Sequence, residues 1–186
     1  FESWLADQSL HDGPPVPQPQ SIIYTSGTTG SPKGVRRYAP TAEQEAAAVA
    51  MRALVYGIKP GARALIPGPL YHSAPNAFAV RAGRMVELLV LTARFDPERI
   101  DTMFMVPTMF IRLMKLSEVV RQRYAVSSLR HVIHAAAPCP PNVKKAMIDW
   151  WGPVIYEFYG GTETGDVTFA TSEDAIRKPG TVGKIT

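Results

Sequence analysis

The chain has 186 residues, of which 46% are hydrophobic and 19% are charged. This length allows one domain or two small ones, and the hydrophobic fraction is ordinary for a protein with a packed core, so a disordered tail is excluded. Lys and Arg number 20 against 16 for Asp and Glu, which gives a formal net charge of +4. The basic residues are scattered, so the charge is compatible with a small anionic ligand but does not indicate nucleic-acid binding.

Cys139 is the one cysteine of the sequence. It excludes an internal disulfide and a cysteine-based zinc site, which favours a reducing compartment and a buried structural thiol. No apolar run approaches the roughly 20 residues that span a bilayer, and the first residues lack a basic-then-apolar signal pattern. These features predict a cytoplasmic protein without a transmembrane segment.

Residues 1–20 are predicted to form an extended lead-in, because the stretch "DGPPVPQPQ" at 12–20 contains four prolines. Proline forbids helix here and favours loosely held backbone, so we expect regular structure to begin after it. Residues 21–24, "SIIY", predict a strand that enters a loop, and residues 35–39, "VRRYA", predict a second strand. The two strands would flank the loop as a hairpin.

The clearest predicted helix covers residues 41–56. Thr41 is its expected cap, Gln44 occupies the reciprocal capping-box position, and Gly57 ends it. A strand at 62–66 follows, then a helix from 74 to about 81 that Ser73 would cap.

The rest of the chain repeats an alternation of strand and helix. We expect a buried strand at 86–91, a strand at 103–106, a helix at 107–116, a strand within 129–137, a helix at 141–151 and a strand at 154–159. This order predicts a layered α/β fold with a largely parallel sheet and flanking helices. Only "TARFDPERIDT" separates Leu91 from Met103, which is short for a crossover between parallel strands. We therefore expect that residues are missing between Pro97 and Met103.

The stretch "YTSGTTGSPKGV" at 24–35 joins glycines and small hydroxyl residues to one lysine, Lys33. Such residues let backbone N–H groups and side-chain oxygens converge on an anion, and the lysine adds a mobile positive charge suited to terminal phosphates. The P-loop pattern fails here, because Pro32 and Gly34 prevent a helix from starting beside the lysine. A flexible exposed hairpin is the alternative, but it would not need this run of glycines and hydroxyls.

These residues carry a resemblance. "YTSGTTGSPKG" resembles the phosphate-binding signature of the adenylate-forming enzymes, which include acyl-CoA synthetases, luciferases and peptide-synthetase adenylation domains. "PLYHSAP" at 69–75 and "YEFYGGTETG" at 156–165 follow in the family's order, so the resemblance covers 21–186. The run "GPLYHSAPNAF" is most similar to fatty-acyl and related acyl-CoA ligases.

The resemblance implies a reaction in which a carboxylate attacks the α-phosphorus of ATP, and coenzyme A then takes the acyl group from the acyl-adenylate. It implies that Lys33 holds the departing pyrophosphate, that Tyr159 lies against adenine, and that Thr162 contacts the α-phosphate. Glu163 would bind Mg²⁺, as suits a hard carboxylate, and His72 would lie near the acyl carboxylate or the mouth of its pocket. The remaining nucleotide contacts that it implies are Thr25, Ser26, Gly27, Thr28, Thr29, Gly30, Ala136, Ala137, Pro138 and Gly160.

Each of these residues also has a structural interpretation. Glu163 could be a solvated turn carboxylate, Tyr159 a core residue and His72 a surface residue, and the Met and Phe residues of "MFMVPTMF" fit an ordinary core better than an acyl tunnel. The segment 134–140, "HAAAPCP", could simply pack tightly at a strand end.

Family members are longer, and they carry a ribose-binding aspartate and a mobile C-terminal domain with a catalytic lysine. We therefore expect residues 21–186 to be a partial AMP-binding domain that does not turn over by itself. The alternative is a noncatalytic nucleotide-binding module with the same fold. Neither the acid that is activated nor the oligomeric state follows from the sequence.

Overall fold

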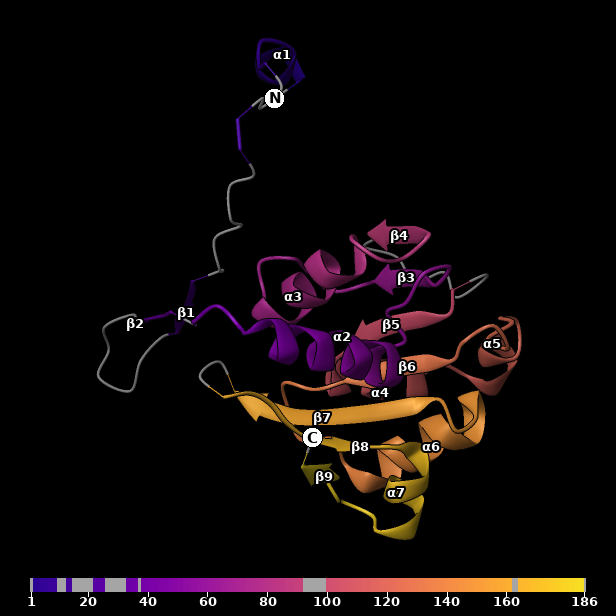
Figure 1. Ribbon diagram of the computed structural model, residues 1–186. Helices are drawn as coiled ribbons and strands as arrows, with labels where there is room; N and C mark the ends of the chain where they lie inside the picture. Colours follow the sequence, from indigo (N-terminus) through magenta and orange to yellow (C-terminus); the bar gives the residue numbers. More distant parts are fainter. Residues whose placement is uncertain are drawn as a thin grey trace. The chain divides into compact units, whose positions relative to one another are not determined.

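The computed structural model describes residues 2–9, 13–14, 22–25, 33–36, 38–91, 100–161 and 164–185. The chain divides into two units, residues 1–39 and residues 40–186, and each is described here by itself. Figure 1 shows their elements.

The first unit contains a short helix and a hairpin. Strands β1 (Ile23–Thr25) and β2 (Lys33–Val35) pair antiparallel, with Thr25 opposite Lys33. A hairpin was predicted here, but its second strand was expected at residues 35–39 and lies instead at Lys33–Val35. Helix α1 (Glu2–Ala6) shows that the expectation of a wholly extended start was wrong. The helix precedes the prolines, and Glu2 in its first turn interacts favourably with the helix dipole.

The second unit is built on a seven-stranded sheet with the order β4-β3-β5-β6-β7-β8-β9. From β4 to β7 each strand pairs parallel with the next in this order, whereas β8 pairs antiparallel with both β7 and β9. This confirms the predicted α/β fold with a largely parallel sheet. The strands are β3 (Arg63–Ile66), β4 (Leu88–Leu91), β5 (Thr102–Met105), β6 (His131–His134), β7 (Ile155–Gly161), β8 (Gly165–Ala170) and β9 (Lys184–Ile185).

Helices cover both faces of this sheet (Figure 1). Along β6, Val132 belongs to the core under α4 and α6, and its neighbour Ile133 belongs to the core under α2 and α3. This alternation is what a strand buried on both faces requires. The helices are α2 (Ala42–Tyr56), α3 (Ser73–Ala82), α4 (Pro107–Met114), α5 (Glu118–Arg121), α6 (Pro141–Trp151) and α7 (Ser172–Arg177).

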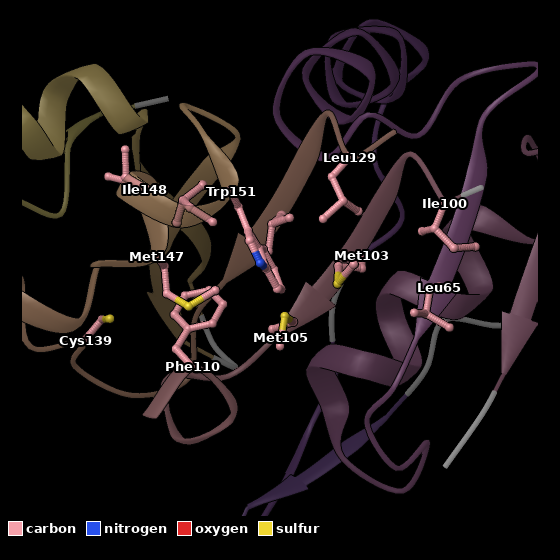
Figure 2. Close-up of a cluster of buried hydrophobic side chains, with 12 residues drawn as sticks. Leu65, Ile100, Met103, Met105, Phe110, Leu129, Cys139, Met147, Ile148 and Trp151 are labelled. Atoms are coloured by element: carbon pink, nitrogen blue, oxygen red, sulfur yellow. The ribbon is translucent and has the colours of Figure 1, made fainter. Parts of the chain in front are cut away.

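The core beneath α4 and α6 is rich in methionine and aromatic side chains (Figure 2). Phe110 and Trp151 meet edge to face with ring centroids 6.5 Å apart, and Met103 and Met147 are fully buried beside them. The Met and Phe residues of β5 and α4 therefore pack as ordinary core. Cys139 is buried at the edge of the same cluster, and burial raises the pKa of its thiol to about 11. This agrees with the expected structural role.

Two element predictions differ from the structure. Ser73 does not cap α3, because the helix begins one residue earlier: the carbonyl of His72 already accepts the first helical bond, from the Asn76 N–H at 3.1 Å. Strand β4 is not fully buried, because it lies at the edge of the described sheet, next to β3. Strand β4 lies on one side of β3 and β5 on the other. The predicted gap after Pro97 lies outside the described residues.

Candidate functional site

The parallel strands place several predicted site residues at one edge of the sheet. Because β3, β6 and β7 run in the same direction, their carboxyl ends meet there, which is where open α/β sheets bind ligands. His72 follows β3, residues 136–138 follow β6, and Tyr159 and Gly160 lie near the end of β7. The structure therefore brings His72, residues 136–138 and Tyr159 with Gly160 to this edge, which we call the binding edge.

The segment after β6 is exposed and strained. The side chains of Ala136, Ala137 and Pro138 are exposed, whereas Ala135 and Cys139 on either side are buried. Ala136 has a φ of 71°, and it is the one non-glycine residue in the described part of the chain with a positive φ. This backbone conformation disfavours residues with a Cβ, and such strain concentrates at functional sites. Residues 136–138 therefore form a short exposed strip, with small side chains, that follows β6 and lies next to β7.

Tyr159 is 60% exposed although β7 begins in the core. Its strand passes from buried Ile155 to exposed residues at the carboxyl end. The exposure excludes the core interpretation of Tyr159 and leaves an aromatic face free to contact a base. Gly160 is held close to β8, since a Cβ at this position would lie 1.9 Å from the carbonyl oxygen of Gly165. Glycine is therefore required here.

His72 lies at the amino end of α3 and its side chain is exposed. Its ring lies 4.6 Å from the ring of Tyr71 and makes no capping hydrogen bond to the helix. The position leaves the imidazole accessible from the binding edge.

The remaining predicted residues are described less fully. Lys33 and Thr25 belong to the first unit, where they pair across the hairpin. Ser26, Gly27, Thr28, Thr29 and Gly30 lie outside the described residues, and so do Thr162 and Glu163. Within the described ranges no group of three or more His, Cys, Asp or Glu side chains could hold a metal ion. The predicted Mg²⁺ ligand, Glu163, falls between the described Gly161 and Thr164.

A buried ion pair lies beneath the binding edge. The Lys144 ammonium group of α6 donates to the carboxylate of Glu157 on β7, and both side chains are almost fully buried. Nδ1 of His134, the last residue of β6, lies 4.0 Å from Glu157 Oε1. Burial, and then the charge of Lys144, lower the pKa of His134 to about 3, so this imidazole is neutral at pH 7. The contacts among Lys144, His134 and Glu157 join α6, β6 and β7 directly before the exposed residues 136–138 and 159–160.

A second polar cluster, in which Tyr56 is buried and Asp166 and Arg81 are partly buried, lies on the opposite face of the sheet. The phenol of Tyr56 at the end of α2 donates to Oδ2 of Asp166 on β8, and Arg81 Nη1 of α3 lies 3.9 Å from the same oxygen. Neither polar group was anticipated from the sequence. Glu157 did carry a signal, because a carboxylate inside the apolar strand "VIYEFY" requires a buried partner.

No helix in the described part of the chain is long and apolar enough to cross a bilayer.

The fold and the binding edge are those of a nucleotide-binding α/β domain. A model of the AMP-binding enzyme family matches residues 4–186, so the chain belongs to this family of adenylate-forming enzymes. It is 31% identical to the mitochondrial medium-chain acyl-CoA ligase ACSF2 of Danio rerio over 186 aligned residues, which cover 90% of this chain and 29% of the relative. It is 33% identical to the putative acyl-CoA synthetase YngI of Bacillus subtilis over 177 residues, or 88% of this chain and 31% of the relative.

Solved structures agree. The N-terminal domain of FACL13 from Mycobacterium tuberculosis, bound to an inhibitor, superposes with a TM-score of 0.71 at 29% identity, covering 94% of this chain and 46% of that one. The amide bond synthetase McbA from Marinactinospora thermotolerans gives a TM-score of 0.71 at 28% identity, covering 92% and 36%. The chain spans about 30% of the length of the curated relatives it matches.

Proposed function

We propose that this chain is part of an ATP-dependent acid–thiol ligase that activates a fatty acid as its acyl-adenylate and transfers the acyl group to coenzyme A. The supporting observation is the pair of exposed strips, residues 136–138 and Tyr159 with Gly160, at the carboxyl edge of a parallel sheet. Among the relatives, several are named medium-chain or long-chain fatty-acid CoA ligases, and one is named 2-succinylbenzoate–CoA ligase. The names support an acyl-CoA product and leave the acid to experiment.

In the proposed reaction, a carboxylate oxygen of the acid attacks the α-phosphorus of ATP, and the bond to the bridging oxygen of pyrophosphate breaks. The thiol of coenzyme A then attacks the acyl carbon, loses its proton and displaces AMP. Such chemistry needs charge neutralisation and in-line positioning rather than a nucleophilic side chain. Mg²⁺, when bound, would neutralise phosphate charge.

Each predicted residue has a role in this proposal. Lys33 and residues 25–30 would hold the terminal phosphates, Thr162 the α-phosphate and Glu163 the Mg²⁺ ion. Tyr159 would lie against adenine, and the exposed strip at 136–138 would contact the nucleotide mainly through backbone. His72 would lie beside the carboxylate of the acid.

The single cysteine supports the proposal that the protein is cytoplasmic, which cell fractionation would test.

The test is pyrophosphate release in the protein that carries this chain, with octanoic, palmitic and benzoic acids as substrates. We expect Lys33→Ala to reduce kcat/KM by roughly a hundredfold, because removing one charged phosphate contact costs a few kcal/mol of transition-state stabilisation. Lys115→Ala is the matched control, since Lys115 is an exposed lysine at the end of α4.

Two results would contradict the proposal. Pyrophosphate release that is unchanged in Lys33→Ala would show that the loop does not bind the phosphates through this lysine. ATP binding without release, with every acid, would favour the noncatalytic nucleotide-binding module.

A further inference from the structure

The pairing of β7 with β8 is irregular at Tyr159. Tyr159 lies opposite Thr168, but Gly160 lies opposite Asp166, so one step along β7 corresponds to two steps along β8. This is a β-bulge. Bulges bend a strand and change the direction in which a side chain points, and they are frequent beside active sites.

Asp166 is anchored at this bulge from the face that α2 and α3 cover. Its Oδ2 accepts a hydrogen bond from the Tyr56 phenol and lies 3.9 Å from Nη1 of Arg81. Tyr56 is only 3% exposed. Burial, and then the charge of Asp166, raise the pKa of Tyr56, so the phenol remains protonated and continues to donate.

Tyr56 is itself fixed against both strands of the bulge. Its ring meets the ring of Phe158, the residue before Tyr159, edge to face at 5.6 Å. Its backbone carbonyl accepts a hydrogen bond from the Thr102 hydroxyl of β5 at 2.6 Å. The end of α2 therefore contacts β7 through a ring and β8 through a charged hydrogen bond.

A displacement of β8 at Asp166 would displace Tyr159 as well. Gly160 pairs with Asp166 and leaves no space toward Gly165. The backbone before Gly160 carries Tyr159. The two strands thus leave no room for a side chain at the position where Asp166 is held.

We propose that Asp166, held by Tyr56 and Arg81, is a positioning residue that fixes the bulge and so directs Tyr159 toward the adenine of the nucleotide. This inference rests on the proposed function, because the nucleotide-binding role of Tyr159 is part of that function. Asp166 does not contact the nucleotide; it acts through the backbone of β7.

The test compares binding of AMP and of inorganic pyrophosphate by isothermal titration calorimetry, in the protein that carries this chain and in its Tyr56→Phe and Asp166→Asn variants. AMP carries the adenine that Tyr159 would contact, whereas pyrophosphate would bind the loop that contains Lys33. We expect both variants to raise the dissociation constant for AMP about tenfold, because a small misplacement of a contact group costs this much or more. The constant for pyrophosphate should remain within about twofold, since phosphate contacts act independently of the base.

The controls separate positioning from folding. Tyr124→Phe removes a phenol that is 48% exposed, and it should change neither constant. Weakening of both ligands in parallel would indicate a general loss of structure and would overturn the positioning role. If Asp166→Asn does not fold, Tyr56→Phe decides, since it leaves the carboxylate paired with Arg81.

The outcomes also distinguish the two proposals. If the unsubstituted protein binds AMP and both variants bind it equally well, the positioning role is wrong and the proposed function stands. If the unsubstituted protein binds neither AMP nor pyrophosphate, the proposed function fails, and this inference fails with it.

Discussion

His134 should make the stability of the protein depend on pH in a range where most side chains do not titrate. It is fully buried, and within the described residues neither ring nitrogen has a hydrogen-bond partner. The charged groups that face it are Glu157 and Lys144. Its pKa falls from 6.5 to about 3 on folding.

The sign follows from proton linkage. Because the folded pKa of His134 is depressed, the unfolded chain binds a proton on this residue below pH 6.5, whereas the folded chain does not bind it until the pH approaches about 3. Stability is therefore fully present above pH 6.5 and is lost as the pH falls toward about 3. Each pH unit in this window contributes about 1.4 kcal/mol, so acidification from about pH 7 to about pH 5 should lower the free energy of unfolding by about 2 kcal/mol through this residue alone.

The assay is urea unfolding at a series of pH values from about 7 to about 5, followed by tryptophan fluorescence. Trp151 is a suitable reporter, because it contacts Phe110, whose ring lies 5.3 Å from that of His134. His131 also has a pKa lowered by burial and adds a change of the same sign. The comparison is therefore with His134→Gln, which should remove the His134 share. Equal pH dependence in the two proteins would refute the reasoning.

Two further predictions concern stability at neutral pH. Lys144→Met should cost about 3–5 kcal/mol because it leaves Glu157 as an unpaired buried charge, whereas Lys145→Met, one residue along the same helix, removes an exposed pair and should cost less than about 1 kcal/mol; similar losses in urea unfolding would contradict the buried pair. Ala136→Gly should stabilise the fold by about 1 kcal/mol by relieving its positive φ, whereas Ala137→Gly should destabilise it. A thermal unfolding midpoint that falls in both glycine variants would show that the strain is absent.

Local sequence patterns predicted the parallel part of the fold well. The capping box of Thr41 and Gln44 and the left-handed Gly57 define α2 as expected, and the alternation of strand and helix defines the order of elements. Helix α7 was missed although Thr171 and Asp174 form a second capping box. Strands β8 and β9 were also missed, because neither has a strong pattern of its own: β8 pairs with β7, and β9 pairs with β8.

The binding edge was predictable where it depends on strand direction. Residues 136–138 and Tyr159 follow strands whose carboxyl ends must share one edge. The contact of Tyr56 with Asp166 was not predictable, because the two residues are 110 positions apart in the sequence. The ion pair of Lys144 and Glu157 joins consecutive elements, but the sequence did not identify its lysine. Nothing local distinguishes buried Lys144 from exposed Lys145; the rotation of α6 against β7 decides which lysine meets Glu157.

The carboxyl end of α2 has a consequence for how the chain is made. Tyr56 is bonded to Thr102 through its carbonyl and to Asp166 through its phenol, partners 46 and 110 residues further along. A ribosome that has translated α2 must still add 46 residues before the first partner exists and 110 before the second. We therefore expect the end of α2 to reach its final position on a nascent chain only after β8 has left the exit tunnel.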